Sequence, residues 1–175
     1  MRIGSILTVA SPARTRWARL AAVVLWALAG SPSHAQAGAA NALVEASDLA
    51  ADARLAAAKG VPLVVLYSRD DCSWCEKVRR EHLGPLSRNP AVPAVVRELH
   101  MDRAGTVVDF AGRRIASVDF SNQMQARFAP TVMFHGPDGA ALAEPIVGFR
   151  LADFYAAYLD RAIEESRTRL QRRNP

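Results

Sequence analysis

The chain has 175 residues, half of them hydrophobic, and carries a formal net charge of +5. This length suits one domain with an ordinary core, and this hydrophobic share excludes a chain that is disordered throughout. Most of the charge excess lies at the N-terminus, because residues 1–35 contain four arginines and no acidic residue, whereas residues 36–175 contain 18 basic and 17 acidic residues. No basic stripe runs through the body of the chain, so we expect no nucleic-acid partner.

Residues 1–35 have the pattern of a secretory signal peptide. Arginines come first, and they are followed by the ten-residue apolar run 20–29 and by a small-x-small sequence that ends at Ala35. A membrane span needs about 20 apolar residues, so the run is too short for one. We therefore predict export across the inner membrane to the periplasm, cleavage after Ala35 and a mature domain over residues 36–175. The alternative is an uncleaved segment, which would be the chain's only contact with the membrane.

The first half of the mature chain predicts a helix, a buried strand and a second helix. Apolar residues at helical spacing predict a helix over residues 41–59. The unbroken apolar run 61–67 is typical of a strand that is buried on both faces. Asp71 is a suitable N-cap for a helix over residues 72–83, and Gly84-Pro85 would end that helix.

The middle of the chain predicts an irregular segment, a strand and an inserted hairpin. Residues 86–93 contain two prolines and are expected to be irregular. Residues 95–101 are a strand candidate. Residues 106–110 and 114–120 flank a short sequence centred on Gly112, which indicates a β-hairpin.

The last part of the chain predicts a helix, a strand pair and a closing helix. Ser121 is expected to cap a short helix that reaches Phe128. Residues 131–134 and 140–147 would form two strands around a turn rich in glycine and proline. The closing helix, residues 151–169, has one apolar stripe made of Leu151, Phe154, Tyr155, Tyr158, Leu159 and Ile163.

The two cysteines of the chain, Cys72 and Cys75, form a Cys-x-x-Cys motif directly after the predicted buried strand. Disulfide exchange needs one exposed sulfur that is partly ionised and a second sulfur close enough to displace the bound partner. The N-terminus of a helix stabilises the thiolate, and a spacing of three residues brings the second sulfur within reach. The motif predicts Cys72 as the nucleophile and Cys75 as the resolving cysteine.

Two other interpretations of the cysteine pair remain open. Both thiolates could serve a metal-binding module or carrier for zinc or copper, although His82, His100 and His135 are scattered singly and show no ligand spacing. A purely structural disulfide would close a very small loop and add little stability. We therefore assign no metal ligand and no cofactor to the chain.

Residues 64–80, VVLYSRDDCSWCEKVRR, resemble the active-site strand and helix of thioredoxins, and residues 128–134, FAPTVMF, resemble the second signature of that family. The similarity extends over roughly residues 41–165. It implies an α/β thioredoxin fold, with a central mixed sheet flanked by helices, here with an inserted hairpin. By the same resemblance Pro130 is expected to be cis and to face Cys72.

The resemblance also implies an activity, namely thiol–disulfide oxidoreduction. Among thioredoxins the chain is most similar to longer exported members, including those associated with sulfur-oxidation systems. Protein disulfides would be the substrates, and a membrane thiol carrier would supply the electrons. Trp74, Ala129 and Pro130 are the expected substrate-binding residues, with the Ala129 backbone pairing with an extended peptide.

Two departures from the family pattern bear on the chemistry. Leu66, six residues before Cys72, stands where many thioredoxins have a buried carboxylate that helps to move the proton of the resolving cysteine. Asp70 and Asp71 are the nearest carboxylates in the sequence. Ser73-Trp74 replaces the usual Gly-Pro, and the charge of Asp71 disfavours a thiolate at Cys72, which favours a stable disulfide and hence a reductant.

Overall fold

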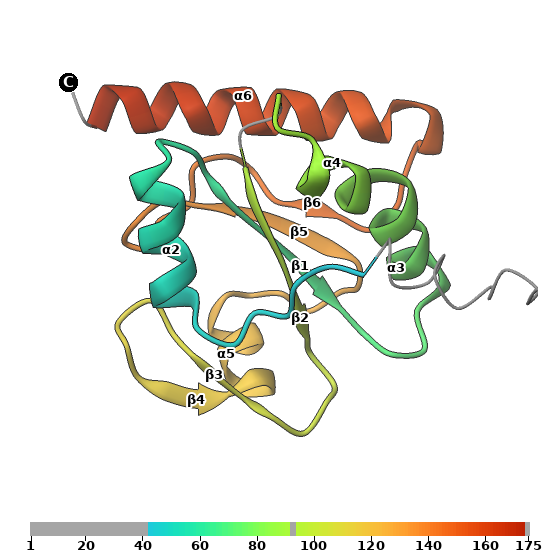
Figure 1. Cartoon of the computed structure of the whole chain (residues 1–175). Coiled ribbons are helices and arrows are strands. Elements are labelled where there is room, and N and C mark those ends of the chain that lie inside the picture. The colour runs from blue at the N-terminus through green and yellow to red at the C-terminus, as the bar shows by residue number, and fades with distance from the viewer. Residues whose placement is uncertain (1–41, 92–93, 174–175) are drawn as a thin grey trace, which may run out of the picture. The chain divides into compact units, whose positions relative to one another are not determined.

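A computed structural model describes residues 42–91 and 94–173 (Figure 1). The predicted signal segment, residues 1–35, and its cleavage site lie outside the described residues. Within the described ranges, no helix has the length and apolar character that a bilayer crossing requires.

A mixed four-stranded sheet forms the centre of the domain, in the order β2-β1-β5-β6. β1 pairs parallel with β2 and antiparallel with β5, and β5 pairs antiparallel with β6. Every residue of β1 is buried, as its unbroken apolar sequence predicts. The bounds of the four strands are Leu63–Ser68 for β1, Val95–His100 for β2, Thr131–His135 for β5 and Ile146–Val147 for β6.

Helices cover both faces of this sheet. Alternate residues of β1 divide between two apolar clusters, because successive side chains of a strand point to opposite faces. One cluster includes residues of α2 and α5, and the other includes residues of α3, α4 and α6. The helices are α2 (Leu49–Ala58), α3 (Ser73–Val78), the π-helical segment η1 (Arg79–Leu83), α4 (Gly84–Arg88), α5 (Ser117–Gln123), the 3-10 turn η2 (Ala152–Phe154) and α6 (Tyr155–Arg173). The predicted α/β architecture is confirmed.

The predicted hairpin is present but shorter than expected, with strands β3 (Thr106–Val108) and β4 (Arg114–Ala116). The Asp109 carboxylate holds its turn by accepting hydrogen bonds from the backbone N–H groups of Ala111 and Arg113. Phe110 then packs against the turn after β5, where a Cβ on Gly139 would lie 2.4 Å from the phenyl ring. This contact requires glycine at position 139, whose φ is also positive.

The buried imidazole of His135 lies beside the same turn, with Nδ1 3.0 Å from the carbonyl oxygen of Gly139. Burial lowers the pKa of His135 to about 4. As the pH falls, His135 therefore binds a proton in the unfolded chain before it does so in the folded protein. The free energy of unfolding should decrease between pH ~6.5 and ~4 by at most about 3 kcal/mol. Urea unfolding across this range should show the loss, and His135→Asn should lack this contribution.

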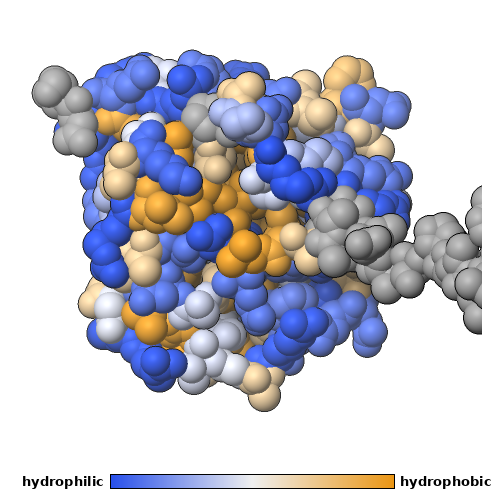
Figure 2. Space-filling view, in the orientation of Figure 1, coloured by the Kyte–Doolittle hydropathy of each residue, from blue (hydrophilic) through white to orange (hydrophobic). Residues whose placement is uncertain are grey.

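The first helix begins later than its apolar spacing predicts. Residues 42–47 are not helical, and Glu45 forms an isolated parallel bridge with Glu98. The N–H of Ala46 donates to the Glu98 carbonyl, and the N–H of Glu98 donates to the Val44 carbonyl, on the outer side of β2. An outer strand leaves unpaired backbone groups, and this segment pairs some of them. Asp48 then caps α2 by accepting a hydrogen bond from Ala51 N at 2.7 Å. Val44, Leu55 and Val95 line part of one pocket. Figure 2 shows that apolar surface is exposed on this face of the molecule.

The second helix also differs from the prediction at both ends. Asp71 is not the N-cap, because Cys72 takes that position. Gly84-Pro85 does not end the helical stretch, and the residues up to Arg88 are helical instead of irregular. Pro85 lies in the first turn of α4, where a missing N–H removes no hydrogen bond of that helix.

Three predictions in the C-terminal half were also wrong in part. α5 begins at Ser117 and ends at Gln123, so the residues after Ala116 continue as a helix, and Ser121 lies inside it, donating to the Ser117 carbonyl. Of residues 140–147 only the two residues of β6 form a strand. The apolar stripe of the last helix is half buried, because Tyr155, Leu159 and Ile163 enter the core whereas Leu151, Phe154 and Tyr158 are exposed.

Candidate active site

The two cysteines form a disulfide at the start of α3, with an S–S distance of 2.04 Å and a Cα–Cα distance of 5.2 Å. β1 ends at Ser68, and a short loop of residues 69–71 connects the strand to Cys72. Cys72 is partly exposed and Cys75 is fully buried. The backbone N–H of Cys75 donates to Cys72 Sγ at 3.1 Å. In the reduced protein a donor in this position would favour the thiolate of Cys72.

Trp74 lies between the cysteines in the sequence and is 54% exposed. Its indole stacks on Phe149, with ring centroids 5.4 Å apart, and the ammonium group of Lys77 lies 6.0 Å from the indole centroid. The side chain therefore packs on a loop from the C-terminal half while it leaves a large apolar surface exposed beside the disulfide.

The loop before β5 lies at the same end of the sheet as the cysteines, because Tyr67 of β1 pairs with Thr131 of β5. The peptide bond between Ala129 and Pro130 is cis. The carbonyl of Pro130 accepts a hydrogen bond of 2.7 Å from the N–H of Gly148. Phe128 is 69% exposed, so apolar surface borders this loop as well.

Leu66 is fully buried and lies in the apolar cluster that contains Val78 of α3 and Val132 of β5. The two carboxylates named from the sequence lie outside the core. Asp70 pairs with Arg103 at 2.7 Å and with His100 at 3.1 Å, and the hydrogen bond from Arg103 is the main reason that the pKa of Asp70 is lowered. Asp71 is exposed.

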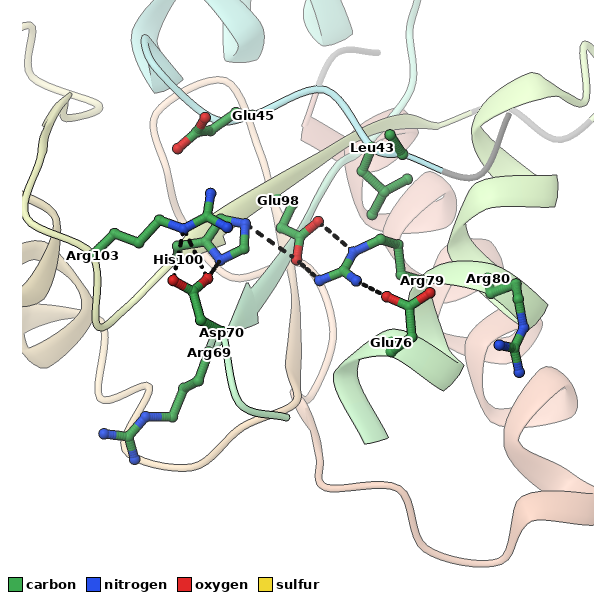
Figure 3. Close-up of a pocket in the computed structure, with 11 residues that line it drawn as sticks. Leu43, Glu45, Arg69, Asp70, Glu76, Arg79, Arg80, Glu98, His100 and Arg103 are labelled. Atoms are coloured by element: carbon green, nitrogen blue, oxygen red, sulfur yellow. Dashed lines mark hydrogen bonds and ion pairs between the residues drawn. The ribbon is translucent and has the colours of Figure 1, made fainter. Parts of the chain in front are cut away.

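A buried ion pair beside this site was missed from the sequence (Figure 3). The side chain of Glu98 is 5% exposed. Its carboxylate accepts two hydrogen bonds from the guanidinium group of Arg79, at 2.8 and 2.5 Å, and one from the Ser68 hydroxyl at 2.6 Å. Burial alone would raise the pKa of Glu98, but these hydrogen bonds outweigh it and lower the pKa. The alternation of side chains along a strand could have predicted that Glu98 is buried, because residues two apart share a strand face and Val96 is buried.

The three histidines considered as metal ligands have different surroundings. His82 packs against the rings of Phe149 and Tyr155, whereas His135 contacts the carbonyl of Gly139. His100 lies with Asp70 and Asp102, and ligand atoms of these three residues are within 4.8 Å of one another. This group contains neither cysteine, and Arg103 already occupies the Asp70 carboxylate.

Comparison with known proteins finds no matching family model and no matching curated protein. Solved structures of similar fold include the DsbH oxidoreductase, with a TM-score of 0.51 at 15% identity over 78% of this chain and 92% of that chain. Mitochondrial thioredoxin 3 from Saccharomyces cerevisiae has a TM-score of 0.49 at 17% identity over 72% and 97% of the respective chains. The periplasmic thioredoxin SoxS from Paracoccus pantotrophus has a TM-score of 0.42 at 16% identity over 60% and 98%.

These similarities concern the fold. The chain has a thioredoxin fold, and a Cys-x-x-Cys disulfide stands at the start of the helix that follows its central strand.

Proposed function

We propose that this protein is a thiol–disulfide oxidoreductase that reduces protein disulfides through Cys72 and Cys75. The main support for the proposal is that the two disulfide-bonded cysteines differ in exposure. Cys72 is partly exposed, whereas Cys75 is fully buried. A partner can approach one sulfur only, and the other sulfur is held one helical turn away.

The reaction proceeds in two exchange steps. The thiolate of Cys72 attacks one sulfur of the substrate disulfide, forms a mixed disulfide and releases the other substrate sulfur as a thiolate, which takes a proton from solvent. Cys75 then loses its proton to water, and its thiolate attacks Cys72 Sγ. The bond between Cys72 and Cys75 forms as the bond between Cys72 and the substrate breaks, and the second substrate sulfur leaves as a thiolate that takes a proton from solvent. Two electrons have then passed to the substrate.

The apolar surface beside the sulfurs supports a protein substrate. Trp74 and Phe128 are exposed on the two segments that meet at this end of the sheet. We assign substrate contact to Trp74 and to the backbone of Ala129 and Pro130, which an extended peptide would pair with by strand addition. Exposed aromatic residues of this kind are common at protein interfaces.

The periplasm is the proposed location, and a membrane thiol carrier is the proposed electron donor. The signal pattern of residues 1–35 supports export. A reductant in an oxidising compartment must be re-reduced, so its disulfide needs a donor that crosses or spans the membrane. The same proposal includes that the protein is one of the exported thioredoxins associated with sulfur-oxidation systems.

The reduction potential of the Cys72–Cys75 couple tests the proposed direction of transfer. Equilibration of the mature protein with glutathione or dithiothreitol, followed by mass spectrometry of alkylated thiols, should place the couple nearer to about −270 mV than to about −120 mV. A value near the upper figure would make the protein an oxidant. Stoichiometric zinc or copper in the purified reduced protein would instead favour the metal carrier.

A further inference from the structure

The ion pair between Glu98 and Arg79 is joined to the buried cysteine through the helix, because Arg79 follows Cys75 in the same helical stretch. Arg79 is one helical turn beyond Cys75, and its backbone N–H donates to the Cys75 carbonyl. Residues four apart lie on the same side of a helix. The side chain of Arg79 is 18% exposed, and its guanidinium group reaches the carboxylate of Glu98 on β2.

The sheet places Glu98 beside Leu66, the apolar residue six positions before Cys72. Glu98 is the register partner of Leu66, and neighbouring strands are about 4.8 Å apart. Partners in register point to the same face of a sheet, which is here the face that Val78 of α3 covers. A buried carboxylate therefore lies under α3, one strand away from Leu66.

Glu98 is poorly suited to accept the proton of Cys75. Two hydrogen bonds from Arg79 and one from Ser68 stabilise the ionised carboxylate, and the pKa of Glu98 lies below its ordinary value. The carboxylate therefore acts as a fixed negative charge, and Arg79 acts as a fixed positive charge that balances it.

We propose that the Glu98–Arg79 pair is a positioning element that balances charge one helical turn beyond Cys75 and thereby sets how readily the resolving thiol loses its proton. A negative charge in a poorly solvated region opposes a second negative charge nearby, and a positive charge favours it. This role rests on the proposed function, because Cys75 must be deprotonated before it attacks Cys72 Sγ and releases the substrate thiol.

Other charged groups around the pair define the controls. Glu76 contacts the same guanidinium group from α3, but its side chain is 52% exposed, so water screens its charge. His100 Nε2 lies 3.7 Å from the Glu98 carboxylate on β2, and its Nδ1 contacts Asp70 in the loop after β1. Ser68 of β1 is the remaining hydrogen-bond partner of Glu98 and carries no charge.

The test is the pH midpoint for alkylation of Cys75 in reduced protein that carries Cys72→Ala, read by mass spectrometry. Adding Glu98→Gln keeps the shape of the side chain but removes its charge. The midpoint should fall by about one pH unit, which is about tenfold more thiolate at a given pH. The matched control Glu76→Gln should move it by less than about 0.3 units, because that charge is exposed.

Two further variants separate charge from packing. Arg79→Met should raise the midpoint, and this opposite shift tests the proposal independently if the Glu98→Gln protein does not fold. The double variant Arg79→Met/Glu98→Gln removes both charges and should return the midpoint to within about 0.3 units of its starting value. A merely structural pair would lower the melting temperature of these variants without opposite shifts in the midpoint.

The proposal is overturned if folded Glu98→Gln protein keeps the original midpoint, or if the double variant does not restore it. This measurement needs no substrate, so it remains valid if the protein fails to reduce insulin. That failure would count against the proposed function, whereas an unchanged midpoint would count against the role of the ion pair.

Discussion

Replacement of Cys75 by alanine is expected to trap mixed disulfides between Cys72 and the protein's substrates. Cys72 is the partly exposed sulfur and remains able to attack, whereas no second thiol is left to displace the bound substrate. Disulfide reduction should fall to the level of a protein without either cysteine. Non-reducing electrophoresis of periplasmic extracts, followed by mass spectrometry of the trapped species, measures the effect.

The matched control is Cys72→Ala, which keeps only the fully buried sulfur. It should be equally inactive but should trap few partners, because a protein disulfide cannot approach Cys75. Similar amounts of trapped protein in both variants would contradict the assignment of Cys72 as the nucleophile.

The second large effect is expected from Leu66→Asp, which should raise turnover and lower stability together. A carboxylate at this buried position would have a raised pKa and could accept the proton of Cys75 near neutral pH. The structure adds a further cause, because Glu98 is the register partner of Leu66 and its negative charge would raise that pKa more. Insulin reduction assays at several pH values measure the change in turnover.

The loss of stability in Leu66→Asp follows from the same burial. Leu66 is fully buried, so the variant loses apolar contacts and buries a carboxyl group beside a carboxylate. We expect a loss of roughly 3–5 kcal/mol at neutral pH. Since the pKa of the new carboxyl group is raised in the folded state, its ionisation destabilises the fold as the pH rises through that pKa, and the deficit should be smaller in acid.

Leu66→Asn separates the two effects. It has nearly the same shape as the aspartate variant but cannot accept a proton, so it should lose stability without a gain in turnover. A folded Leu66→Asp protein with unchanged turnover would show that the proton of Cys75 already has another route, through Asp70, Asp71 or water.

Local sequence was sufficient for the core of the site. An unbroken apolar strand, a polar loop and Cys-x-x-Cys are contiguous in the chain, so residue order alone places the sulfurs at the end of a buried strand and the start of a helix. The hairpin was similarly predictable, because turn residues and β-branched neighbours act over a few positions. The helix ends were less predictable from the sequence. Cys72 is the N-cap in place of Asp71, and Pro85 lies in the first turn of α4, so it does not end the helical stretch.

Long-range pairing decided what surrounds the sulfurs. Glu98 contacts Ser68 and Arg79 only because the fold places β2 beside β1 and brings the first residue of η1 to β2, and no residue near Glu98 in the sequence indicates those partners. Trp74 meets Phe149 for the same kind of reason, through a loop distant in the sequence. The sequence by itself determined the reactive pair and the class of fold, since both depend on local order and hydrophobic pattern. Only the tertiary structure decided the electrostatic environment of the pair, because charges act through space between segments that the fold brings together.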